Sequence, residues 1–302
     1  NRKDALCLSY PSCPNFNLYI MSIAKNFTCQ SICAFLLMLL FFSAKNVDAQ
    51  LDTRHYFPPL YSDNSVDQHY LVLSTPLSIP FAYEVTDGTG NVIFTGTISQ
   101  NSPATIVLED FNFDHDVRGV IDEDSLNTPV VADGLIITGQ GAFFAGIRHK
   151  TSNQATILSS KGSLALGTEF RAGHAFTRWR ASQRNHFTSV MATEDSTIVK
   201  FHNPSVGYIG HTFGDTITVM LNEGESYVIA QEINSVYNGT ESEFNGTHIL
   251  SNHPVVVNSG TWLGGPITTA HDIGADQILP VNLAGNSYVF MHGEHSDLTR
   301  EK

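Results

Sequence analysis

The amino-acid sequence predicts an all-β protein built from tandem β-sandwich-like units. From Gln68 onward, short runs rich in Val, Ile, Thr, Tyr and Phe alternate with turn residues, and such side chains suit a pleated, half-buried surface. No segment after residue 50 shows the spacing of an amphipathic helix. The second half of the chain also repeats the pattern of the first, which indicates two units of one kind.

The first unit is predicted over residues 50–163. Its strands are expected where β-type runs are separated by turn dipeptides, of which Asp87-Gly88 and Ser102-Pro103 are the clearest. The expected strands lie at 69–73, 81–85, 92–95 and 104–108.

The second unit is predicted over residues 164–285 because three of its segments match earlier ones. The matched pairs are 69–76 with 186–193, 101–108 with 223–230, and 133–146 with 245–258. Units of roughly 100–120 residues have the size of a domain, which favours sandwiches. A β-propeller-like arrangement is the alternative, although typical blades have only about 40–50 residues. Residues 286–302 are expected to open a truncated third unit, so the chain is interpreted as a fragment.

Residues 21–49 have the pattern of a secretory signal peptide. Lys25 precedes an apolar run at 34–42 that is too short to span a bilayer, and small residues three and one before Gln50, Val47 and Ala49, suit a signal peptidase. Cleavage is predicted after Ala49, which makes the mature protein secreted or attached to the cell surface. Residues 1–20 are interpreted as upstream sequence from an over-long reading frame.

Cysteine and charge content limit the chemistry of the mature chain. All four cysteines precede Gln50, so a thiolate nucleophile or a thiolate zinc site is excluded after the cleavage point. The net charge of −13 disfavours nucleic acid and anionic membranes as partners. We expect extracellular partners, no nucleic acid, and no membrane insertion of the mature chain.

No catalytic motif is present, and we expect a protein that is not an enzyme. The sequence has no Gly-x-Ser-x-Gly elbow, no His-Glu-x-x-His pair and no phosphate-binding glycine loop. One alternative remains open: Asp272 and Asp276 are candidate paired carboxylates of a polysaccharide-acting hydrolase.

An acidic stretch between two expected strands is the candidate metal site. Calcium takes several hard oxygen ligands from one flexible loop, and this stretch supplies them without the glycine and closing glutamate of an EF-hand. A solvated acidic loop is the alternative. No other cofactor is expected, and the candidate calcium ligands are Asp114, Asp116, Asp122 and Asp124.

The two tryptophans are assigned different roles. Trp179 lies between Arg178 and Arg180, and this combination is typical of contact hot spots and of stacking on sugar rings. These three residues are the predicted ligand contacts. Trp262 ends an expected strand and is predicted to lie in the core.

Several segments together resemble a known family. The run Gly246-Thr-His-Ile-Leu-Ser-Asn-His-Pro-Val-Val-Val257 is one of the two longest of them. In this order they are similar to the N-terminal domain of the IgGFc-binding protein family, well over 164–290 and more loosely before it. The opening at 50–61 is similar to large exported surface proteins of the Bacteroidetes. The other segments are 166–170, 187–197, 216–227 and 276–281.

The resemblance implies an extracellular binding or adhesion module for protein or glycan ligands, forming the N-terminal part of a larger surface protein. Animal members of the family bind the Fc part of immunoglobulin G and occur in mucus. The family has no catalytic motif, so no site residue carries over to this chain. A structural spacer in a long surface protein is the alternative function.

Overall fold

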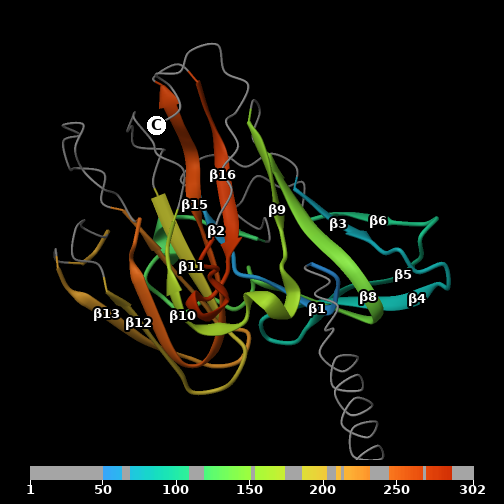
Figure 1. The fold of residues 1–302 in the computed structure, drawn as a ribbon, viewed down its shortest axis with the longest axis horizontal. Helices are drawn as coiled ribbons and strands as arrows, with labels where there is room; N and C mark the ends of the chain where they lie inside the picture. The colour runs from blue at the N-terminus through green and yellow to red at the C-terminus, as the bar shows by residue number, and fades with distance from the viewer. Residues whose placement is uncertain are drawn as a thin grey trace, which may run out of the picture. The chain divides into compact units, whose positions relative to one another are not determined.

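The computed structural model confirms the all-β class. It describes residues 50–62, 69–108, 119–150, 154–173, 186–202, 209–211, 214–231, 245–267 and 270–287. Two seven-stranded antiparallel sheets lie within one compact unit, Asp48–Lys302 (Figure 1). In these described ranges, helical structure is limited to short 3-10 turns. They are η1 (Glu123–Ser125), η2 (Gly162–Ala165) and η3 (Val281–Leu283).

The first sheet folds into a sandwich around one long strand, β8. The first half of β8 pairs with β1 and β4, and its second half pairs with β3 and β9. The two layers are therefore β5-β4-β8-β1 and β6-β3-β8-β9. Gly139 and Gly141 lie where β8 passes between them, which suits a strand that turns a corner. The strands are β1 (Asp52–Phe57), β3 (Tyr70–Ser74), β4 (Phe81–Asp87), β5 (Val92–Ile98), β6 (Ala104–Val107), β8 (Leu135–Lys150) and β9 (Ala155–Ser159).

The second sheet has the same strand order around β15. Its layers are β13-β12-β15-β10 and β14-β11-β15-β16. Each strand of the first sandwich thus has a counterpart in the second, in the same order along the chain. Pro254, which cannot donate a ladder hydrogen bond, lies where β15 turns. The strands are β10 (Gly167–Arg171), β11 (His186–Ala192), β12 (Thr197–His202), β13 (Thr216–Leu221), β14 (Ser226–Ala230), β15 (His248–Ile267) and β16 (Ala270–Ile278).

The three segment pairs matched in the sequence lie on corresponding strands, but one is displaced by a residue. His69 and His186 correspond, because each backbone carbonyl accepts from the residue after β6 or β14. Val107 pairs with Tyr70, and Ala230 pairs with Phe187, so Val107 is the structural counterpart of Ala230. The sequence match had aligned Leu108 with Ala230. Only the ladder fixes this register, and a shift of one residue moves a side chain to the other face of a sheet.

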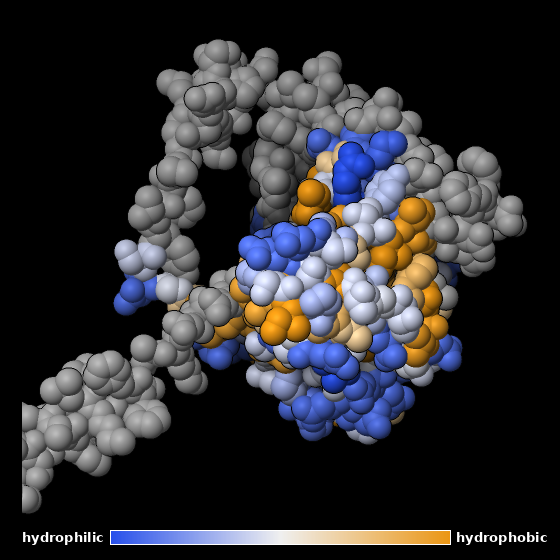
Figure 2. All heavy atoms as spheres, turned by 90° about the vertical axis from the view of Figure 1, so that its right-hand side faces the viewer, coloured by the Kyte–Doolittle hydropathy of each residue, from blue (hydrophilic) through white to orange (hydrophobic). Residues whose placement is uncertain are grey.

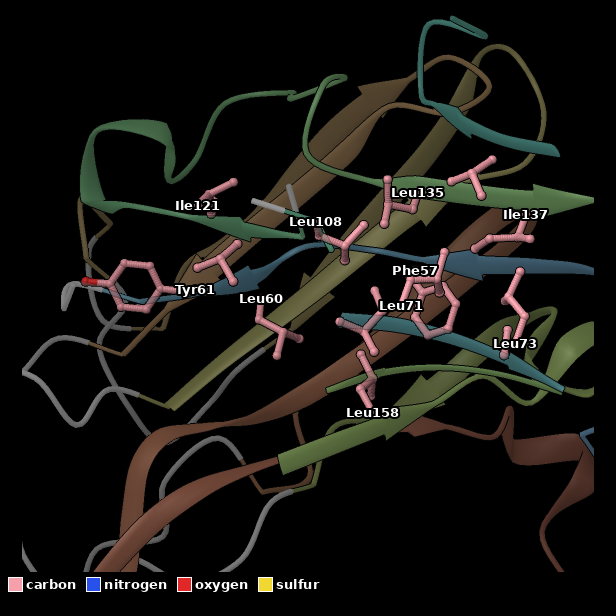
Figure 3. Close-up of a cluster of buried hydrophobic side chains, with 14 of the residues drawn as sticks. Phe57, Leu60, Tyr61, Leu71, Leu73, Leu108, Ile121, Leu135, Ile137 and Leu158 are labelled. Carbon is pink, nitrogen blue, oxygen red and sulfur yellow. The ribbon is translucent and has the colours of Figure 1, made fainter. Parts of the chain in front are cut away.

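The hydrophobic core joins the two sandwiches into one body. The first core cluster contains Phe57, Leu71 and Leu135 of the first sandwich (Figure 3) and Phe187 and Trp262 of the second. The cluster also includes residues of two short strands that pair in parallel, β2 (Leu60–Tyr61), which follows β1, and β7 (Val120–Ile121), which precedes β8. A second cluster lies between the layers of the second sandwich. The layers stack as sandwiches and do not radiate as propeller blades.

Candidate binding faces and the joint between the sandwiches

Gln277 of β16 is the centre of the joint between the sandwiches. Its side chain is fully buried, and its Nε2 donates to the Tyr56 carbonyl oxygen at 2.9 Å. Its Oε1 accepts from the Lys161 backbone N–H at 2.7 Å and from the Ser160 hydroxyl at 3.3 Å. One amide therefore satisfies backbone groups of two segments that precede it by more than 100 residues.

Further close contacts join the two sandwiches. Asn258 Nδ2 donates to the Pro58 carbonyl oxygen at 2.7 Å across the joint. A Cβ added at Gly88 would lie 2.2 Å from the Gly224 carbonyl oxygen, so two hairpin turns meet there without side chains. The joint is consequently packed and hydrogen-bonded like a protein interior, and it fixes which sheet faces remain exposed.

A fully buried histidine pair lies beside Trp262 in the shared core. Nδ1 of His69 lies 3.1 Å from Nδ1 of His149, and both rings are 6.3 Å from the indole. Burial, and the neighbouring His69, lower the pKa of His149 well below its usual value, so it is neutral at pH 7. These rings are out of reach of a ligand and serve packing. The prediction that Trp262 is a core residue is confirmed.

The outer side of the layer β13-β12-β15-β10 is the candidate ligand surface, which we call the polar face. Side chains alternate along β12, so that Val199 and Phe201 enter the core while Ile198, Lys200 and His202 point outward. Strand pairing aligns Thr216, His202, His248 and Arg171 in one row across four strands. The next row contains Thr218, Lys200, Leu250 and Glu169.

Short polar contacts order the polar face. Nε2 of His248 lies 2.9 Å from Oε1 of Glu169, and the Thr216 hydroxyl lies 3.1 Å from Nδ1 of His202. The two imidazole rings are neighbours, with centroids 6.1 Å apart. This arrangement offers rings, hydroxyls and both signs of charge on a flat surface, which suits the polar surface of a protein or a sugar.

A sheet face of the first sandwich, on the layer that does not correspond to the polar face, has a different character, and we call it the apolar face. It is the outer side of the layer β6-β3-β8-β9, where Val72, Val107, Phe144 and Ile157 are 40%, 39%, 38% and 65% exposed. Its charged members are the cations Arg148 and Lys150. Orange hydrophobic patches interrupt the polar surface in Figure 2, which views the end of the molecule where β3 to β6 lie.

Five predicted site residues lie outside the described part of the chain: Trp179, Arg178 and Arg180 of the ligand loop, and Asp114 and Asp116 of the acidic stretch. Asp122 caps η1, where its Oδ1 accepts from the Ser125 N–H at 3.2 Å, and Asp124 lies within that turn. No group of three or more metal-ligating side chains occurs among the described residues. Calcium binding stays a prediction.

Asp272 and Asp276 are engaged at the joint. Asp272 Oδ1 accepts from the Ala155 N–H at 3.0 Å, and Asp276 Oδ2 accepts from Lys161 Nζ at 2.7 Å. Each carboxylate thus bonds to a different segment of the preceding sandwich, Asp272 to the start of β9 and Asp276 to the residue before η2. This geometry gives the hydrolase alternative no support.

Sequence reasoning missed both the polar face and the joint. The alternation in 197–202 was a usable signal for an outward side of β12. Nothing in the sequence marks Gln277, because its partners Tyr56 and Lys161 are distant along the chain.

The part of the chain that the structure describes contains no helix with the length and apolar character of a membrane span.

The fold and its faces define a class: a tandem β-sandwich protein with a packed joint and exposed sheet faces. Residues 154–302 match the family model described as IgGFc binding protein. The match begins just before β9 and includes the whole second sandwich with its polar face. No curated protein and no solved structure gives a significant match.

Proposed function

We propose that the protein is an exported, non-enzymatic binding or adhesion module that recognises extracellular protein or glycan ligands. The observation that carries this proposal is the family match over residues 154–302, since that family is described by a protein-binding property. The predicted signal peptide supports export. In this proposal the module forms the N-terminal part of a larger surface protein.

We assign ligand contact to the polar face. It lies entirely within the family-matched segment, and the joint holds it on the side of the second sandwich away from the first. Its central pairs, His248 with Glu169 and His202 with Thr216, are ordered by contacts that need no ligand. Preorganised groups lose little conformational freedom on binding, which favours recognition by this surface.

The test is an array of glycans and glycoproteins, immunoglobulin G included, probed with the purified protein with and without calcium. We expect specific binding that Lys200→Glu weakens by about tenfold or more, because the exposed cation lies at the centre of the polar face. Loss of the signal on calcium removal would add a role for the acidic stretch.

Glu84→Lys is the matched control. Glu84 holds the position in the first sandwich that Lys200 holds in the second, so both changes reverse one exposed charge on equivalent strands. Binding that is equally weakened by both variants would contradict the polar face as the site. A blank array from folded protein would overturn the binding proposal and favour a structural spacer.

A further inference from the structure

The outer edge of strand β14 is paired with a segment of the first sandwich. Residues 127–130, which lie between η1 and β8, run antiparallel to the start of β14. The Val130 N–H donates to the Ser226 carbonyl oxygen at 2.8 Å, and the Ser226 N–H donates back to the Val130 carbonyl oxygen at 2.8 Å. The Asn127 N–H donates to the Val228 carbonyl oxygen at 3.1 Å. These bonds satisfy backbone groups that a strand edge otherwise leaves unpaired.

Strand β6 of the first sandwich is the counterpart of β14, and among the described strands it pairs with β3 alone. Val107 of β6 is the counterpart of Ala230. Two residues earlier, Thr105 holds the position of Val228. The Leu108 N–H bonds toward β3, so the backbone groups of Thr105 and Val107 point to the opposite edge. No described residue bonds to these outward groups, so the edge that is paired on β14 is open on β6.

The open edge of β6 has none of the features that protect a free strand edge. Natural sheets protect such edges with charged side chains, bulges or proline within the strand. β6 has neither charge nor proline in its four residues, and its pairing with β3 is regular throughout. Pro103 precedes β6 where β14 has Ser226, so one N–H donor is missing, but the carbonyl oxygens of residues 103, 105 and 107 remain available. Figure 2 views the end of the molecule where β6 lies.

We propose that the edge of β6 binds an extended, uncharged peptide segment of another protein by strand addition. In this mode the main chain supplies the hydrogen bonds, and the side chains of the added strand contact the two faces of the sheet. The segment on β14 shows which chemistry fits: residues 127–130 carry no charge, and Val130 packs against the first core cluster. Residues 103–107 carry no charge either, so a charged segment would find no counter-charge on this strand. The edge lies in the first sandwich and is a second binding surface beside the polar face.

Nuclear magnetic resonance of the purified protein, titrated with a synthetic peptide of residues 126–131, tests the proposal. This peptide is the segment that pairs with β14, so it presents the main-chain pattern that β6 should accept. We expect saturable shifts of the Thr105 and Val107 amide resonances, and slower hydrogen exchange of both amides. The Kd should be roughly 0.1–1 mM, because few hydrogen bonds must offset the lost freedom of a short peptide.

Matched controls separate strand addition from side-chain contact. Thr105→Pro places a ring where an N–H points outward, which blocks an added strand and spares the bonds to β3, so binding should weaken at least about tenfold. Thr105→Val keeps the main chain and should bind within about twofold of the wild type. A peptide methylated on the Val130 nitrogen should lose binding, whereas methylation on the Val131 nitrogen should be tolerated, because the Val130 N–H is the one that bonds to β14.

Several results would overturn the proposal. They are equal binding by the two Thr105 variants, equal binding by the two methylated peptides, and no saturable shift at Thr105 and Val107 up to about 5 mM peptide. Shifts confined to Val228 and its neighbours would show exchange with the internal segment and would overturn it as well. Concentration-dependent protection of the β6 amides without peptide would show self-pairing in place of the assigned partner. A blank ligand array leaves these outcomes unchanged, because the array tests the polar face.

Discussion

Replacing Gln277 with leucine should destabilise the whole molecule, because one buried amide holds two segments of the joint. The change keeps most of the side-chain volume and removes all polar atoms. It leaves the Tyr56 carbonyl oxygen and the Lys161 N–H without the partners that now lie at 2.9 and 2.7 Å. Each orphaned buried group costs about 1–3 kcal/mol, so for two groups the free energy of unfolding should fall by about 2–6 kcal/mol.

Urea unfolding followed by tryptophan fluorescence measures this loss, since Trp262 lies in the shared core. A single cooperative transition is expected for the wild type. Asp276→Asn is the matched control at the adjacent position: it weakens only a surface ion pair with Lys161, which is worth less than about 1 kcal/mol. A loss for Gln277→Leu no greater than for Asp276→Asn would refute the reasoning.

Two further predictions concern the core and the hairpin contact. Burial and the neighbouring His69 hold His149 neutral, so its pKa in the folded state lies below the usual 6.5. Below pH 6.5 the unfolded chain therefore binds a proton that the folded chain does not. The free energy of unfolding should fall there by up to about 1.4 kcal/mol per pH unit. Urea unfolding between pH 7.5 and 5 measures this slope, and a flat profile would contradict it. Gly88→Ala should cost about 1–3 kcal/mol, because its Cβ would lie 2.2 Å from the Gly224 carbonyl oxygen. Thermal unfolding of both variants measures this cost, with Gly146→Ala as the control. A Cβ at Gly146 would have no atom nearer than 3.4 Å, so this variant should be tolerated. Equal unfolding midpoints for the two variants would argue against the close contact.

The sequence was sufficient for the all-β class, for the sandwich-like architecture and for the strands that local alternation marks. Alternation in 81–85 and the turn at Asp87-Gly88 are local signals, and β4 with its hairpin to β5 lies where they predict. The family resemblance also came from local motifs, and the match over 154–302 bears it out. The predicted contacts around Trp179 and the acidic stretch await experiment.

Only the tertiary structure decided which faces are covered. Val72 and Ser189 hold equivalent positions, and composition alone would bury the valine and expose the serine. Instead Val72 is 40% exposed and Ser189 is fully buried. Local periodicity determines which residues share a face, because side chains alternate along a strand. Whether that face meets solvent depends on segments more than 100 residues away in sequence, and the joint centred on Gln277 sets their positions.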